Sequence, residues 1–468
     1  MKIRLITTLL FLSICKYGIS QELSPKWAYA FGDGEGENDQ VTASVCDKNG
    51  NIYVAGQFEG LINFNFPQRD HIINGGSSPE DSYILKLDSN LNFIWFKHIV
   101  AYSGSEIRDI ALDNSDNLVV AGYFTDSADF DPSEKEVILY SQTANNSDIF
   151  FAKYDKNGDL VWVNNLPGTS VESASGIAVN SSNEIIISGG YGDSTDFDPG
   201  TGTQWLVATA SVQEGFLAKY DSSGNYIWAF GFPGSSLINY GTDVQIGARD
   251  DIYLSGYFSG TIDMDGSSSI NSLSSSSNRD IFLAKYRDDG SYIWAHAMGG
   301  TGDDNGYHIA LGTDESIYLA GEFRGSADFD PSSSSANRSS NGNDDFFLAR
   351  YDSSGNYKWV HSFGNSSTDR LGDLVCDLND HVFITGYFVD SIDFDPANNN
   401  YAGLFGNSGD VYIASYDSAG NYRFANKLGE GSFQQGTSLA LNNKSNLFVG
   451  GSYVDSMDLD PGNPNAQI

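Results

Sequence analysis

A repeated pattern of paired carboxylates is the strongest chemical signal in the sequence. In its commonest form it reads Asp-Phe-Asp-Pro, with one apolar residue between two aspartates. Alternate residues of an extended strand point to the same side, so the two carboxylates could converge on one hard cation. The pattern favours calcium, which accepts about six to eight oxygen ligands. The candidate calcium ligands are Asp129, Asp131, Asp196, Asp198, Asp263, Asp265, Asp328, Asp330, Asp393, Asp395, Asp458 and Asp460.

The same pattern also has a purely structural explanation. An Asp close to a Pro favours an extended or turn backbone, and its carboxylate can accept hydrogen bonds from nearby backbone N–H groups. The apolar residue between the aspartates would then pack on a sheet. No complete calcium loop accompanies the pairs, and the first copy of the pattern has Asn63 and Asn65 in place of the aspartates. The sequence leaves the metal and the structural explanations open.

Other catalytic and metal-binding motifs are absent from the sequence. The six histidines show no His-x-x-x-His or mixed Cys/His spacing, so a zinc site has no support. No nucleophile elbow, phosphate-binding loop or dinucleotide fingerprint occurs where a strand would lead into a helix. The sequence therefore predicts no catalytic residue and no cofactor-binding residue, and calcium is the only cofactor it suggests.

The charge and the N-terminus indicate an exported protein. The 468 residues contain 61 Asp and Glu but only 25 Lys and Arg, a net charge of −36 that argues against nucleic-acid binding. Lys2 and Arg4 precede a short apolar run, and small residues lead up to Ser20. This arrangement predicts a signal peptide over residues 1–20 with no later membrane span. We therefore expect a protein secreted by a bacterium or held at its surface.

A repeat of about 66 residues runs through the chain. The aromatic residues that mark it lie 65 to 68 residues apart. Each copy contains four short strand-like stretches, and the last two are joined by a turn such as 352–356. Four antiparallel strands repeated in this way are typical of β-propeller blades. The markers, predicted to be structural, are Trp27, Trp95, Trp162, Trp228, Trp294, Trp359 and Phe424.

The predicted fold is all-β, a seven-bladed β-propeller of four-stranded antiparallel blades in a single domain over residues 21–468. The stretch 27–31 resembles a fourth strand with no first three strands before it. The last copy has a first and a second strand but no fourth strand after it. We therefore expect the N-terminal strand to close the last blade, which removes open sheet edges. No third strand for that blade is recognised before residue 468, so either this sequence is a fragment or the last blade is incomplete and lacks this strand.

The repeat resembles a known family at specific residues. One copy reads Asp-Ile-Phe-Leu-Ala-Lys-Tyr over 280–286, with Gly290 and Trp294 after it and Ile-Tyr-Leu-Ala-Gly over 317–321. These residues resemble the bacterial seven-bladed β-propeller (SBBP) repeat family over nearly all of 25–461. The Asp-x-x-Gly-x-x-x-Trp segment at 221–228 is also similar to the tryptophan-docking repeats of quinoprotein propellers. That similarity implies that each marker tryptophan packs between adjacent blades.

Two functions follow as expectations. The export signal, the repeats and the long Ser- and Asn-rich insertions favour a monomeric binding or adhesion scaffold for an extracellular protein or glycan. The insertions at 266–279 and 332–344 are expected to be loops that face the ligand. The alternative is an extracellular propeller enzyme with its site at the central channel, either a quinoprotein-like oxidoreductase or a polysaccharide-acting hydrolase or lyase.

Overall fold

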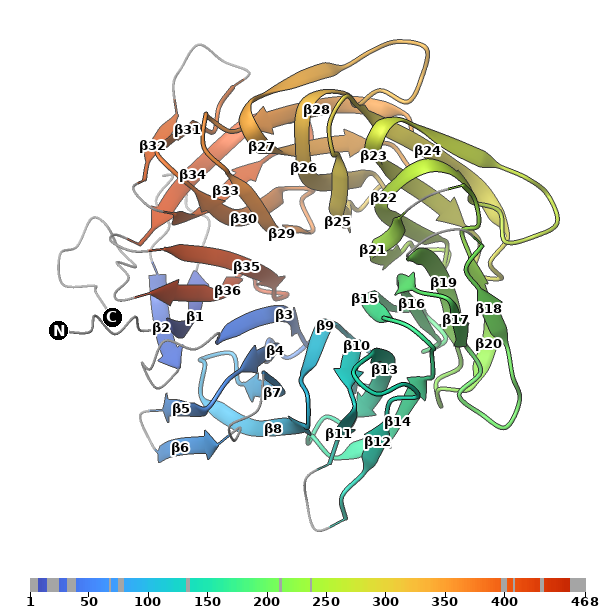
Figure 1. The fold of residues 1–468 in the computed structure, drawn as a ribbon. Helices are drawn as coiled ribbons and strands as arrows, with labels where there is room; N and C mark the ends of the chain where they lie inside the picture. The colour runs from blue at the N-terminus through green and yellow to red at the C-terminus, as the bar shows by residue number, and fades with distance from the viewer. Residues whose placement is uncertain are drawn as a thin grey trace.

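A ring of antiparallel sheets forms the molecule, as the computed structural model shows (Figure 1). The structure describes residues 7–14, 25–31, 39–66, 69–74, 80–131, 135–209, 213–235, 238–396, 402–406, 409–429 and 433–454. All regular elements in these ranges are strands, and none of the ranges contains a helix long and apolar enough to cross a membrane. The prediction of an all-β repeat propeller is confirmed.

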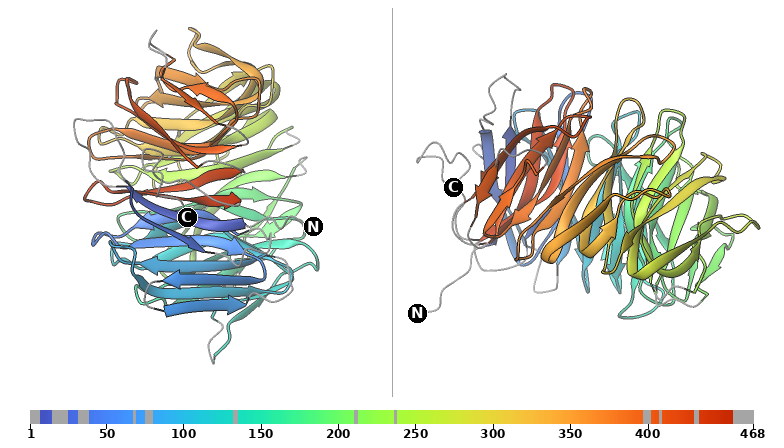
Figure 2. Two further views of the ribbon diagram at one scale, coloured as in Figure 1. Left: turned by 90° about the vertical axis from the view of Figure 1, so that its left-hand side faces the viewer. Right: turned by 90° about the horizontal axis from the view of Figure 1, so that it is seen from above.

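The ring consists of four-stranded antiparallel units, which we term sheets, and short pairings of hairpin strands join some neighbouring units into larger hydrogen-bonded sheets. In chain order the first three sheets are β3(Gln40–Cys46)–β4(Ile52–Phe58)–β7(Asp81–Leu87)–β8(Phe93–Ala101), then β9(Ser105–Leu112)–β10(Leu118–Thr125)–β13(Ser147–Tyr154)–β14(Leu160–Leu166), and β15(Ser173–Val179)–β16(Ile185–Tyr191)–β19(Glu214–Tyr220)–β20(Tyr226–Gly231). Next come β21(Asn239–Ile246)–β22(Ile252–Asp263)–β23(Ser272–Tyr286)–β24(Tyr292–Gly300), β25(Asn305–Leu311)–β26(Ile317–Asp328)–β27(Asn337–Tyr351)–β28(Tyr357–Phe363) and β29(Arg370–Cys376)–β30(Val382–Phe388)–β33(Asp410–Tyr416)–β34(Tyr422–Leu428). The sheet between β34 and β3 consists of β35(Gln434–Leu441), β36(Leu447–Val454), β1(Thr7–Ile14) and β2(Pro25–Phe31). Seen from the edge of the ring, the sheets stack side by side (Figure 2).

Tight turns build each sheet from local sequence. Between β27 and β28, the Gly355 N–H donates to the Asp352 carbonyl at 2.8 Å, and the Asn356 N–H donates to Asp352 Oδ1 at 3.0 Å. Gly355 has a φ of +79°, which a residue without a side chain adopts at little cost. The predicted Gly-containing turn therefore reverses the chain between two strands.

Short hairpins extend most sheets between their second and third strands. They are β5(Leu61–Phe66)–β6(Arg69–Asn74), β11(Ser127–Asp129)–β12(Ile138–Tyr140), β17(Ser194–Asp196)–β18(Trp205–Val207) and β31(Ser391–Asp393)–β32(Gly403–Phe405). In the sheets of β22–β23 and β26–β27 the long strands continue into the hairpin themselves. The insertions expected as ligand-facing loops are therefore largely paired strands in these two sheets, and Figure 1 shows them at the outer rim.

The sheet that closes the ring differs from the prediction at one strand. The N-terminal strand is present as β2, the outermost strand, but the third position is filled by β1, so the prediction of a missing third strand is wrong. β1 runs antiparallel to β36, from Thr7 opposite Val454 to Ile14 opposite Leu447. It runs antiparallel to β2 as well. An open edge of β36 would expose unpaired backbone groups, and the apolar N-terminal segment satisfies them.

These residues are the ones predicted to form the apolar part of a signal peptide. Cleavage after Ser20 would remove β1, which joins β2 to the rest of the sheet. In one molecule, residues 7–14 cannot both be removed with a signal peptide and form β1 of the closing sheet. The closing sheet is therefore the part of the ring that depends on how the N-terminus is processed.

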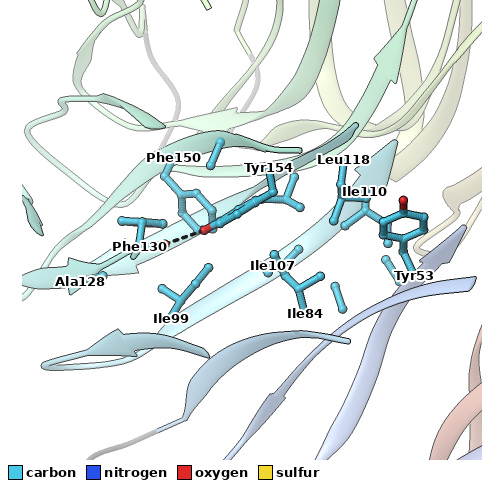
Figure 3. Packing of buried hydrophobic residues seen from close by; sticks show 14 of the residues in the cluster. Tyr53, Ile84, Ile99, Ile107, Ile110, Leu118, Ala128, Phe130, Phe150 and Tyr154 are labelled. Carbon is cyan, nitrogen blue, oxygen red and sulfur yellow. Dashed lines mark hydrogen bonds between the residues drawn. The ribbon is translucent and has the colours of Figure 1, made fainter. Parts of the chain in front are cut away.

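Apolar side chains fill the space between sheets. Figure 3 shows one such cluster, in which Ile84, Ile107 and Phe150 pack together between the first two sheets. The Tyr154 hydroxyl in this cluster donates to the Phe130 carbonyl at 3.0 Å. Equivalent tyrosine-to-carbonyl bonds, between 2.7 and 3.1 Å long, recur at Tyr220, Tyr286, Tyr351 and Tyr416.

Candidate ligand site at the central channel

The paired aspartates lie in the hairpins and hold their turns. The first aspartate of a pair accepts two backbone hydrogen bonds: Asp328 Oδ1 accepts from the N–H of Asp330 at 3.1 Å and of Ala336 at 2.7 Å. The same two bonds, with the second donor eight or nine residues along the chain, are made by Asp129, Asp196, Asp263 and Asp393.

The second aspartates cap the next turn in three copies. Asp198, Asp265 and Asp330 each accept a 2.9 Å bond from the backbone N–H two residues along the chain. Asp131 and Asp395 take the equivalent places in the chain, whereas Asp458 and Asp460 lie outside the described residues. Within the described ranges, no three His, Cys, Asp or Glu side chains are grouped to hold a metal. The hydrogen bonds fit the structural explanation, and calcium binding stays a prediction.

The hairpins also link neighbouring sheets. Ala128 of β11 pairs with Ala101 of β8, and Asp328 of β26 pairs with Gly299 of β24, each in the preceding sheet. The apolar residue between the aspartates is buried in all five copies with described side chains: Phe130, Phe197, Met264, Phe329 and Phe394. The whole motif therefore connects neighbouring sheets.

The marker tryptophans contact the turn of the next sheet. The Trp95 indole N–H donates to the Lys156 carbonyl and that of Trp359 to the Ser418 carbonyl, both at 3.1 Å. Trp162, Trp228 and Trp294 lie against Gly224, Gly290 and Gly355 of the following turns, where a Cβ would come within 3.2–3.3 Å of each indole. Phe424 is buried beside Phe383, and Trp27 lies in β2 opposite Ser13.

The first strand of every sheet lines a central cavity of about 360 Å³. Each of these strands carries a β-bulge, at which one extra residue is inserted opposite the second strand. Bulge residues bridge neighbouring strands around the cavity: Thr42 Oγ1 donates to the Ile107 carbonyl at 2.6 Å, and Thr437 Oγ1 donates to the Val41 carbonyl at 2.6 Å. The channel wall is therefore a chain of contacts between sheets.

Three carboxyls project from this wall, one from every second sheet. Asp109, Asp243 and Asp373 each accept a backbone hydrogen bond of 2.7–2.8 Å from the first strand of the next sheet. Burial, followed by the nearby carboxylates of Asp243 and Asp373, raises the pKa of Asp109. Burial raises the pKa of Asp243 to about 7 and that of Asp373 to about 8. The channel therefore holds carboxyls that resist ionisation.

A histidine occupies the equivalent place in the fifth sheet. His308 Nδ1 lies 3.6 Å from Asp373 Oδ1. Burial lowers the pKa of His308 to about 4, so the imidazole is neutral near pH 7 and offers a hydrogen bond instead of a charge. The wall therefore combines neutral donors and acceptors.

One end of the channel opens into a wider cavity of about 660 Å³, which we term the channel mouth. It is lined by four tyrosines, Tyr123, Tyr240, Tyr257 and Tyr307, and shares Arg108, Ser175, Thr242 and His308 with the channel. The Tyr240 and Tyr257 rings stack with centroids 5.9 Å apart and planes 10° from parallel. Partly exposed aromatic rings around a concave opening are suited to binding the apolar face of a ligand.

Arginine–carboxylate pairs accompany these tyrosines. Arg108 Nε lies 3.1 Å from Glu106, and its guanidinium is 5.5 Å from the Tyr123 ring centre. The Arg279 guanidinium lies 5.2 Å from the Tyr257 ring centre. Arg279 and Arg370, which bonds Glu322 at 2.8 Å, both interact electrostatically with Tyr307. The arginine charges are largely balanced, so the mouth offers hydrogen-bonding groups without a strong net charge.

The residues of the channel and its mouth were not predicted from the sequence, because they do not form a recurring motif. The strand signals were read from positions that stay alike, such as the Gly and Phe or Tyr that frame the end of each second strand. The residue between them varies from copy to copy, and in two copies, as Tyr123 and Tyr257, it lines the mouth. A comparison of the copies for variable positions would have found it: Gln57, Tyr123, Gly190, Tyr257, Glu322, Tyr387 and Ser452.

Known proteins resemble the chain at low identity. No family model matches it. An uncharacterized WD repeat-containing protein, L264 of Acanthamoeba polyphaga mimivirus, is 25% identical over 93% of this chain and 36% of its own length. The regulatory protein FlaEY of Caulobacter vibrioides is 24% identical over 45% of this chain and 22% of its own length. The chain thus spans about a third or less of these relatives.

Solved structures share the arrangement only loosely. The WD40 domain of Neurospora crassa Pan2 aligns with 88% of this chain and 89% of its own, at 8% identity and a TM-score of 0.42. A protein of unknown function from Bacteroides caccae aligns with 74% of this chain and 89% of its own, at 8% identity and a TM-score of 0.36. From its own ring of sheets and its similarity to a WD-repeat protein, the chain is a β-propeller repeat protein.

Proposed function

We propose that this chain is an exported, seven-bladed β-propeller that acts as a binding scaffold, with its ligand site at the channel mouth. The observation that carries the proposal is the contrast within the repeat: the blade-to-blade residues recur, whereas the residues around the mouth change from blade to blade. A site that binds one asymmetric ligand needs different groups around its rim. Propellers of WD repeats are generally protein-interaction scaffolds, which is consistent with this role.

An extracellular glycan or protein is the ligand that the mouth fits. Tyr257 and Tyr307 offer aromatic faces, and the paired Arg370 and Glu322 lie beside Tyr307. Sugars and peptides both combine apolar faces with donors and acceptors, so both suit such a surface. A nucleic acid does not, because the chain has a net charge of −36.

Array binding tests the site. We expect the purified protein to bind at least one glycan or protein on arrays of extracellular glycans and bacterial surface proteins. The double variant Tyr257→Ala/Tyr307→Ala should weaken that binding about tenfold or more. An aromatic side chain that the ligand covers at the centre of an interface contributes about 2 kcal/mol to the free energy of binding. Tyr140→Ala is the matched control, since Tyr140 is 69% exposed on the outer hairpin strand β12. Binding that survives the double variant, or no binding at all, would contradict the proposed site.

Export has its own test. We expect the protein recovered from the medium or cell surface of its host to begin at Gln21, as N-terminal sequencing would show. A recovered protein that still begins at Met1 would contradict the export part of the proposal and leave the binding part standing.

A further inference from the structure

Equivalent acidic positions recur where each sheet meets the next. At six interfaces, a residue at or just before the start of a first strand donates its backbone N–H to a carbonyl of the preceding sheet. This carbonyl belongs to a residue in the third strand or directly before it. Three of these interfaces bring two carboxyls together: Asp148 with Glu172, Asp280 with Asp304, and Asp345 with Asp369. The other three hold one carboxyl and one neutral side chain: Asp81 with Ser105, Glu214 with Asn239, and Asp410 with Gln434.

The two carboxyls of a pair are buried and close. At the interface between the fourth and fifth sheets, Asp280 is 2% exposed and Asp304 is fully buried. A Cβ placed on Gly299 would lie 2.8 Å from Asp280 Oδ1 and 2.9 Å from Asp304 Oδ2, so both oxygens converge on this glycine. Gly168 lies against Glu172 and its N–H donates to Asp148 Oδ1 at 3.4 Å, and Gly364 lies against Asp345.

Backbone N–H groups surround these pairs but leave oxygens unused. Asp304 accepts from the N–H of Gly300 at 2.8 Å and of Arg324 at 3.2 Å, and Asp280 Oδ2 accepts from Ser276. Oδ1 of Asp280 and Oδ1 of Asp345 are buried without a hydrogen-bond partner. A buried oxygen of this kind is costly unless a donor faces it, and a proton on the neighbouring carboxyl would be such a donor.

The charged groups around the pairs are acidic as well. Asp193 faces the pair of Glu172, Asp303 faces that of Asp304, and Asp344 and Asp390 face that of Asp345 and Asp369. The nearby guanidiniums bond other partners: Arg279 lies 3.3 Å from Asp303 and Arg324 lies 2.7 Å from Asp344. Among the described residues, no Lys, Arg or His side chain forms an ion pair with a member of the three pairs.

The single-carboxyl interfaces are built differently. Asp81 lies 2.8 Å from His98 Nε2, Glu214 accepts a 2.7 Å bond from the Tyr191 hydroxyl, and Asp410 lies 3.8 Å from Lys427. Each lone carboxylate therefore has a side-chain donor or cation within reach. The double interfaces have a second carboxyl in place of the neutral Ser, Asn or Gln.

We propose that each double-carboxyl interface binds one proton near neutral pH, shared between its two carboxyls, and that this proton holds neighbouring sheets together. The proton comes from solvent, bonds one carboxyl oxygen and is donated to the other carboxyl. A metal cation fits less well, because backbone N–H groups point their positive ends at the same oxygens. Two adjacent carboxyls cannot easily both ionise in a buried site.

The raised pKa values of the paired carboxyls agree with a bound proton at each interface. Burial, as the largest cause, raises the pKa of Asp148 to about 6, of Glu172 to about 8, of Asp304 to about 7 and of Asp345 to about 6. A group whose pKa is raised by folding stabilises the folded state below its unfolded value, near 4, and this stabilisation is lost as the pH rises through the folded value. We therefore expect these interfaces to weaken between about pH 5 and 8.

Amide variants test the proposal in the full chain. Asp304→Asn, Glu172→Gln and Asp369→Asn copy the neutral residues of the other interfaces, so the fold should tolerate them. We expect the triple variant to melt a few degrees above the parent at pH 8 and at a similar temperature at pH 5. Its proton release between these pH values, measured by titration, should be smaller than that of the parent. Asp159→Asn, which removes an exposed carboxylate on the turn between β13 and β14, serves as the control and should leave proton release unchanged.

Infrared spectroscopy detects protonated carboxyls directly. If the carboxyl pairs had only a structural role, their substitution would not change this signal. The parent protein at pH 7 should show the carbonyl band of protonated carboxylic acids, and the triple variant should lose part of it. The proposal is overturned if the triple variant keeps the parent's pH profile and acid band. It is also overturned if added calcium chloride stabilises the parent at pH 8 but not the variant, because the pairs would then bind a cation.

Discussion

The aromatic and hairpin contacts between sheets and the side chains that line the channel come from the same repeat, yet the first recur and the second vary. Between sheets, equivalent residues perform the same task in copy after copy: Trp95 and Trp359 bond equivalent turns at the same 3.1 Å distance. Along the channel, equivalent positions hold different chemistry, with Asp243 in one sheet and His308 in the next. Regular contacts stabilise the ring, and irregular positions are free to vary.

The difference teaches where function can be sought in a repeat protein. A residue that recurs in most copies is explained by the packing that these copies share, as the aspartates of the hairpins show. A residue that departs from its copies at a buried or concave place has no such explanation. Tyr307 at the channel mouth is a departure of this kind.

The closing sheet should give the largest effect, because it is the one sheet that joins the two ends of the chain. β2 reaches this sheet only through β1. We expect deletion of residues 1–20 to lower the thermal midpoint strongly and deletion of residues 1–31 to add little. Calorimetry on both deletions and on the full chain, produced without export, measures this. A further large loss on deleting residues 21–31 would show that β2 finds the ring without β1.

A single docking tryptophan should give the next largest effect. Trp359→Ala removes a ring packed against Gly420 and the indole bond to Ser418, and we expect a loss of about 3–5 kcal/mol in unfolding free energy. Trp205→Ala is the control, because Trp205 is 43% exposed. Denaturant unfolding measures both. Equal effects for the two variants would contradict the role of Trp359 between sheets.

The sequence predicted the regular half of this comparison well. Aromatic markers, turn residues and apolar strands each follow from a local rule and repeat, so the four-stranded units and the N-terminal strand β2 could be recognised. The place of β1 could not, because its pairing with β36 joins residues more than 400 apart and its composition is typical of a signal peptide. Long-range pairing leaves no local trace in such a segment.

The irregular half was predicted poorly for a physical reason. The channel is formed only when the first strands of all sheets meet, so Asp109, Asp243 and Asp373 approach one another although they are far apart in the sequence. Their raised pKa values come from burial, which no spacing rule reports. The hairpin aspartates showed the opposite problem, since an obvious pattern suggested a metal site where one oxygen of each first aspartate already accepts two backbone hydrogen bonds.

Substitution of a hairpin aspartate should lower the free energy of unfolding by less than substitution of a docking tryptophan. Asp328→Ala removes an acceptor for the N–H groups of Asp330 and Ala336, which we expect to cost about 1–3 kcal/mol. Asp328→Asn keeps a carbonyl oxygen there and should lose less than half as much. Thermal unfolding of both variants with and without calcium and a chelator measures this. A calcium-dependent midpoint in the parent that either variant abolishes would favour the metal explanation instead.

Substitution of a channel carboxyl should give the smallest change in the free energy of unfolding, and this change should be a stabilisation. Asp243 has a pKa raised to about 7 by burial, so the stability it contributes is present below its unfolded value near 4 and is lost as the pH rises through 7. Asp243→Asn keeps an acceptor for the Ile309 N–H without burying a charge near Asp109. We expect the variant to be about 1 kcal/mol more stable than the parent at pH 8 and nearly equal at pH 5. If the variant is less stable at pH 8, the channel wall needs an ionised carboxylate, and the distinction between packing contacts and a freely varying wall does not hold there.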